Sequence, residues 1–147
     1  FTRFEKVEEP NYFYYQHDLS TVHLITEEKC RDRLRAAELL YEECGRRGVS
    51  GSLRQEMEYR FTELYYVNTL FAYMQGVKRP GLSFVRGLRK GVEARFSRFQ
   101  ENPYFLRYTG EEERRLIAMQ GRSDFRFFWY YRLKLLVRRW KSRGRKE

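Results

Sequence analysis

The sequence has few of the residues from which catalytic and metal sites are usually built. Among its 147 residues there are only two histidines, two cysteines and three prolines. We predict that Cys30 and Cys44 share one helix, where a rise of about 1.5 Å per residue separates them by roughly 21 Å, far beyond disulfide reach. The same separation disfavours a zinc site formed with His17 and His23. We expect two reduced, buried thiols, as in a reducing compartment.

Long apolar runs are also missing. A membrane-spanning helix needs about 20 consecutive apolar residues, whereas the longest aromatic run extends only from Phe127 to Tyr131. The first residues, Phe1 to Lys6, lack the apolar segment of a secretory signal. We therefore predict a cytoplasmic protein that does not span a bilayer. Because the first residue is not Met, we also expect the chain to be part of a longer protein.

No residue pattern typical of catalysis is present. Acidic pairs such as Glu27 and Glu28 fall in expected first turns of helices, where the helix dipole explains them better than acid–base chemistry does. With two histidines, a serine or cysteine nucleophile has no evident base. The glycines match neither GxGxxG nor the Walker pattern. We predict no catalytic residue, no metal and no cofactor site in this chain.

Positive charge is concentrated near the C-terminus. The chain has a net charge of +10, and from Arg122 onward ten lysines and arginines stand against two acidic residues, a net charge of +8. This asymmetry indicates an anionic partner at that end, such as lipid head groups or nucleic acid.

Apolar spacing predicts a mainly α fold. The clearest helix follows Thr26, with a stripe from Cys30 to Cys44 and a stop at Gly45 or Gly48. Alternation around Pro10 in residues 3–16 instead predicts two short strands. We expect a bundle of about four to five helices preceded by a short β-hairpin. The further helices are predicted over residues 52–76, 84–99, 109–121 and from 123 onward, with capping boxes at Ser52–Gln55 and Thr109–Glu112.

The segment from Glu8 to Thr21, EEPNYFYYQHDLST, resembles the end of the catalytic domain in bacterial family 2 glycosyltransferases of the GT-A type. In that family a strand pair closes the nucleotide-sugar-binding fold and leads into a variable helical tail. The resemblance implies that residues 1–24 end a catalytic domain and that residues 25–147 form a C-terminal helical domain. Tyr15 stands where the family has Arg, and Leu19 stands where it has a small residue.

The resemblance implies a parent enzyme that transfers a sugar from a nucleotide diphosphate, often to a lipid-linked acceptor in polysaccharide biosynthesis. Its metal-binding motif and its general base would lie upstream of Phe1, in a catalytic domain that would use a divalent metal and a nucleotide sugar. That upstream catalytic domain would be a partner of this chain. His17 and Ser20 would then line the rim of the donor site. The alternative interpretation is that His17 only ends a strand and Ser20 only caps a turn.

The last predicted helix has apolar residues on two sides. At about 100° per residue, a stripe from Phe125 to Trp140 lies on one side, and we predict that it packs against the core. On the other side, apolar residues alternate with bases, and we assign it to a membrane or anion surface. The packing stripe contains Phe125, Trp129, Leu133, Leu136 and Trp140. The assigned surface contains Phe127, Tyr131, Arg132, Lys134, Leu135, Arg138, Arg139 and Lys141.

Three interpretations of this helix stay open. It could lie on the inner face of a membrane and bring a parent enzyme to a lipid-linked acceptor. It could be a helix packed on both sides, whose bases only solubilise it. The chain could instead be a basic helical adaptor that binds nucleic acid or an acidic protein. Nucleic acid is less favoured because no RNP, zinc-finger or helix-turn-helix signature is present.

Overall fold

The computed structural model describes residues 24–49, 51 and 53–143, and this part of the chain is helical and contains no strand. The expectation of a mainly α fold is therefore confirmed. The predicted β-hairpin, His17 and Ser20 lie outside the described residues, as does Ser52 of one predicted capping box. The domain boundary after residue 24 stays a prediction.

The first helix, α1 (Glu27–Arg46), begins and ends where the sequence predicts. The Thr26 side chain accepts a hydrogen bond from the backbone N–H of Lys29 (3.2 Å), as an N-cap residue does. The helix ends just before Gly48, whose φ of +72° is a conformation that glycine adopts without strain. Cys30 and Ala37 are buried on its inner face.

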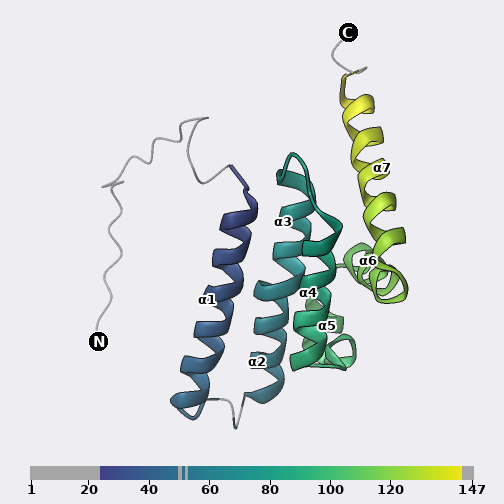
Figure 1. Cartoon of the computed structure of the whole chain (residues 1–147). Helices are drawn as coiled ribbons and strands as arrows, with labels where there is room; N and C mark the ends of the chain where they lie inside the picture. The colour runs from purple at the N-terminus through teal and green to yellow at the C-terminus, as the bar shows by residue number, and fades with distance from the viewer. Residues whose placement is uncertain (1–23, 50, 52, 144–147) are drawn as a thin grey trace, which may run out of the picture.

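A second long helical stretch runs beside α1 and consists of α2 (Arg54–Phe61), a π-helical segment η1 (Thr62–Val67) and α3 (Asn68–Gly76) (Figure 1). Apolar spacing in the sequence predicts a packed stripe along this stretch, made of Leu53, Met57, Phe61, Leu64, Asn68 and Phe71. This prediction is partly wrong, because Leu53 and Asn68 are exposed. A π turn holds more residues than an α turn, so an i, i+4 stripe does not continue through it. The buried side chains from Phe61 to Met74 are Phe61, Thr62, Tyr66, Val67, Thr69, Leu70, Phe71, Tyr73 and Met74.

The remaining helices are shorter except for the last. The predicted helix from 84 to 99 ends earlier, because α4 (Leu82–Arg95) is followed by a 3-10 turn, η2 (Phe99–Glu101). An additional helix, α5 (Pro103–Tyr108), is capped by the Asn102 side chain, which accepts a hydrogen bond from the Tyr104 N–H (2.9 Å). Then follow α6 (Glu111–Arg122) and α7 (Asp124–Arg143).

The predicted capping box of α6 is displaced by one residue. The carboxylate of Glu113, rather than that of Glu112, accepts the hydrogen bond from a backbone N–H, which is that of Gly110 (3.1 Å). Thr109 is buried before the helix begins. The start of the helix is nevertheless close to the predicted one.

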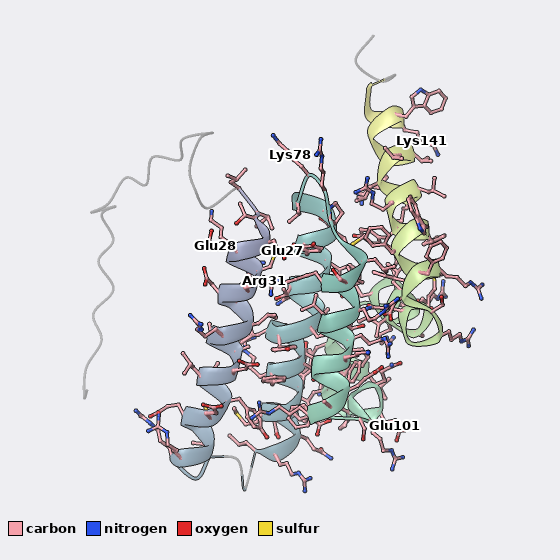
Figure 2. All side chains as sticks on the ribbon, viewed as in Figure 1. Glu27, Glu28, Arg31, Lys78, Glu101 and Lys141 are labelled. Atoms are coloured by element: carbon pink, nitrogen blue, oxygen red, sulfur yellow. The ribbon has the colours of Figure 1, made fainter. Side chains whose placement is uncertain are left out.

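One tyrosine joins the beginning of α1 to α3 and α4. The Tyr73 hydroxyl donates a hydrogen bond to Glu27 (3.0 Å) and accepts one from the Gly81 N–H (2.8 Å). Arg31 pairs with the same Glu27 (2.7 Å), and Figure 2 shows the two side chains on one part of α1. Hydrogen bonds from Arg31 and Tyr73 lower the pKa of the Glu27 carboxyl, so this junction contains a charged Glu27 at neutral pH.

A buried polar network joins α4, α6 and α7. Arg89 donates two hydrogen bonds to Asp124, from Nε to Oδ1 (2.9 Å) and from Nη2 to Oδ2 (3.0 Å). Gln120, which is fully buried, donates to Asp124 Oδ1 (3.2 Å) and to the Val85 carbonyl (2.9 Å). Gln120 Oε1 in turn accepts from the Tyr66 hydroxyl (2.9 Å). The network connects segments that lie 35 to 54 residues apart in sequence.

The network determines the charge state of Asp124. Burial by itself would raise the pKa of this carboxyl, but hydrogen bonds from Arg89 and Gln120 and the charges of Arg89 and Arg86 outweigh it. The pKa of Asp124 therefore lies below its ordinary value of 3.8. Because the folded-state pKa is lowered, the carboxylate stabilises the fold at neutral pH, and this stabilisation is lost as the pH falls below about 4.

We predict that Asp124→Asn lowers the free energy of unfolding by about 3 kcal/mol at pH 7, because it leaves the Arg89 guanidinium with one fewer buried counter-charge. Glu111→Gln is the matched control: it removes an exposed i, i+4 partner of Arg115 and should cost less than about 1 kcal/mol. Urea unfolding followed by circular dichroism measures both. An equal loss of unfolding free energy in the two variants would contradict the claim that the buried network stabilises the fold more than an exposed ion pair does.

A second prediction concerns pH. The difference in unfolding free energy between the wild type and Asp124→Asn should shrink as the pH is lowered from 7 toward 3, because protonation removes the same charge from the wild type. The measurement is the same urea series at several pH values. A difference that stays constant down to pH 3 would show that the charge of Asp124 does not stabilise the fold.

Candidate functional site

The side of α7 that we predict as a membrane or anion surface is partly in the core. Phe127 and Tyr131 are buried, and Phe128 beside them is buried as well. The Tyr131 ring packs on Phe71 (5.8 Å between ring centroids), and its hydroxyl accepts a hydrogen bond from Gln75 (2.9 Å). The assignment of Phe127 and Tyr131 to an exposed surface was therefore wrong. Leu135, farther along the same side, is half-buried.

The stripe that we predict to pack is instead exposed. Its side chains, together with Tyr130 and Val137, are each between 50% and 77% exposed. At about 100° per residue, this stripe lies on the side of the helix opposite Phe127 and Tyr131. The exposed apolar face of α7 therefore consists of Phe125, Trp129, Tyr130, Leu133, Leu136, Val137 and Trp140.

Asp124 explains why the two sides are exchanged. Its helical position falls in the middle of the side that holds Phe127, Phe128 and Tyr131, and its ion pair with Arg89 draws that side against α4. Apolar spacing alone cannot choose between two opposite apolar stripes. The sequence does contain one signal for the buried side. Asp124 is the single acidic residue of this basic helix, and it marks the side that faces a basic partner in the core.

The bases of α7 have different surroundings. Lys134 pairs with Glu112 of α6 and lies 5.8 Å from the centre of the Tyr131 ring. The hydrogen bond from Lys134 lowers the pKa of the Glu112 carboxyl. Arg132 is half-buried, whereas Arg138 and Lys141 are exposed. Arg139 belongs to the same helix.

The far half of α7 extends past the neighbouring helices (Figure 1). Lys141 lies on this extension, and Lys78, in the loop between α3 and α4, lies toward the same end of the molecule (Figure 2). On the extension, Leu136 and Trp140 are more than half exposed and Val137 is half exposed. The described part of the protein thus presents rings, aliphatic side chains and bases on one projecting helix.

The described residues contain no group of three or more His, Cys, Asp or Glu side chains placed to hold a metal ion. Cys30 is fully buried, and burial raises the pKa of its thiol, as expected for an inert core cysteine. Within the same part of the chain, no helix is both long enough and apolar enough to cross a bilayer.

Comparison with known proteins finds no match to the chain among protein families, curated proteins or solved structures.

We predict that Phe127→Ala lowers the free energy of unfolding by about 3 kcal/mol or more, because it leaves a cavity in the core. Phe125→Ala removes the same ring from the exposed side two residues earlier and should change stability by only about 0.5 kcal/mol. Urea unfolding of the two variants measures the difference. A larger loss for Phe125→Ala would contradict the orientation of α7 in which Phe127 is buried and Phe125 is exposed.

Proposed function

We propose that this chain is a non-catalytic docking domain that attaches to an anionic membrane surface through the exposed apolar face of α7. The observation that supports this proposal is the position of seven large apolar side chains in one exposed stripe on a basic helix. Exposed apolar residues scattered singly are ordinary, whereas a contiguous stripe marks a surface that binds a partner.

The composition of the stripe favours a lipid partner. Tryptophan and tyrosine concentrate at membrane interfaces, where an apolar ring enters the acyl boundary and its polar group stays near the head groups. Trp129, Tyr130 and Trp140 have this character. Arg126, Arg138 and Lys141 are exposed on the same helix, and each base near an anionic surface contributes about 1 kcal/mol. This combination is typical of helices that lie in the plane of the interface.

The opposite side of α7 supports the same proposal. Phe127, Phe128 and Tyr131 attach the helix to the bundle, so the exposed stripe can enter a lipid surface without any loss of core packing. The far half of α7 also extends past the neighbouring helices (Figure 1), and Leu136, Val137 and Trp140 on it are exposed. A rigid, already folded helix loses little conformational entropy on binding.

The resemblance of residues 8–21 to family 2 glycosyltransferases extends this proposal to a parent enzyme. A domain attached to the inner face of a bacterial membrane would hold a nucleotide-sugar-dependent transferase close to a lipid-linked acceptor. Polysaccharide biosynthesis uses such acceptors in that family. In this proposal the chain contributes position, and the upstream catalytic domain contributes the metal, the donor site and the chemistry.

We predict that the protein binds vesicles containing phosphatidylglycerol, binds vesicles of phosphatidylcholine much more weakly, and loses affinity as salt is raised. Leu133→Glu should weaken binding at least tenfold, because a carboxylate on the stripe must be desolvated and is repelled by the lipid. Leu39→Glu on α1 is the matched control, since Leu39 and Leu133 are both 60% exposed. Vesicle sedimentation and tryptophan fluorescence measure the binding.

Two outcomes would contradict the proposal. One is equal, negligible binding to both kinds of vesicle. The other is an equal effect of Leu133→Glu and Leu39→Glu, which would show that the stripe is not the contact surface. Tight, salt-sensitive binding to RNA in the absence of vesicle binding would favour the nucleic-acid alternative. Arg138→Glu together with Arg139→Glu should also weaken binding to phosphatidylglycerol vesicles relative to the wild type, because it replaces two positive charges with negative ones.

A further inference from the structure

A small pocket lies where α6 meets α7. It has a volume of about 290 Å³ and is lined by three arginines and two apolar residues, Arg115, Ala118, Met119, Arg122 and Arg126. The four residues from α6 are spaced i, i+3, i+4 and i+7, so they share one face of the helix. Arg126 comes from the first turn of α7, after the break at Ser123. Two helices therefore contribute three arginines to the lining of one pocket.

The positive charge of this pocket is only partly neutralised. Arg115 pairs with Glu111. Among the described residues, no carboxylate forms an ion pair with Arg122 or Arg126. Asp124 lies between them in sequence, but its carboxylate is buried and bound by Arg89 and Gln120. The nearest acidic residue in the chain is thus directed into the core, and two guanidinium groups are left to attract an anion.

We propose that this pocket binds a terminal phosphate or a diphosphate group. The planar guanidinium donates paired hydrogen bonds that match phosphate oxygens, which makes arginine the preferred residue for such groups. A terminal phosphate carries nearly two negative charges at neutral pH, equal to the charge of Arg122 and Arg126 together. The other two lining residues, Ala118 and Met119, are apolar and do not compete for the guanidinium donors.

The size of the pocket limits what it can hold. Pockets for small molecules range from about 300 to 1,000 Å³, so this pocket is at the small end. One or two phosphate groups fit this volume better than a complete nucleotide does. The phosphate could belong to a soluble diphosphate or to a lipid head group, and the chemistry of recognition is the same. The site contains none of the seven apolar residues of the exposed stripe and shares only Arg126 with the bases that support membrane docking. Pyrophosphate binding in the absence of vesicles therefore tests it separately from the proposed function.

The site is tested by titrating the full chain with inorganic pyrophosphate and measuring the binding by calorimetry. Arg122→Ala with Arg126→Ala should weaken binding at least tenfold, because two charge-assisted contacts are lost. Arg35→Ala with Lys90→Ala removes the same charge from exposed positions on α1 and α4 and should leave the affinity within twofold. Ala118→Leu keeps every charge but fills the pocket from an exposed helical position, and it should also weaken binding about tenfold.

The source of the phosphate is distinguished with vesicles of equal surface charge that contain either phosphatidic acid or phosphatidylglycerol. Preference for phosphatidic acid that is lost in Arg122→Ala with Arg126→Ala indicates a lipid head group. Pyrophosphate binding without any such preference indicates a soluble diphosphate. The proposal is overturned if pyrophosphate does not bind at millimolar concentration, if the Arg35 and Lys90 control loses as much affinity, or if Ala118→Leu binds like the wild type.

Discussion

The ion pair between Arg89 and Asp124 determines how α7 is placed on the rest of the protein. It joins α4 to the first residue of α7, and Gln120 and Tyr66 extend the contact to α6 and η1. A buried carboxylate that loses its partner is strongly destabilising, so α7 cannot rotate away from Arg89 at small cost. This constraint turns Phe127 and Tyr131 inward and leaves the opposite apolar stripe outside.

Because of the same constraint, one side of α7 stabilises the fold and the other side carries the proposed docking surface. The inner side of α7 contributes core packing, whereas the outer side contributes much less, because its rings and aliphatic side chains are half or more exposed. The outer side can therefore be selected for binding without a penalty to the fold. It also positions Arg126 beside Arg122, since Asp124 turns inward between them. The proposed lipid-binding stripe and the proposed phosphate pocket both follow from the orientation of Asp124.

The sequence predicts the helices better than their rotations. The start of α1, its buried Cys30 and Ala37, and the approximate bounds of α6 follow from caps and spacing, which are local properties. The stripe through η1 was mispredicted because a π turn depends on how Thr62 to Val67 pack against α1 and α4. The predicted surface of α7 was exchanged with its packed side because both sides are apolar, and the choice between them depends on Arg89, 35 residues away.

By itself, the sequence determined that this protein is mainly helical, that it carries its positive charge near the C-terminus, and that its last helix has two apolar sides. These properties depend on residues close together in the chain. Only the tertiary structure decided which of those sides is exposed and which arginines converge at the junction of α6 and α7. Those outcomes depend on contacts between residues that are tens of positions apart in the sequence. The free energy that decides them is the cost of burying the Asp124 carboxylate without the Arg89 guanidinium.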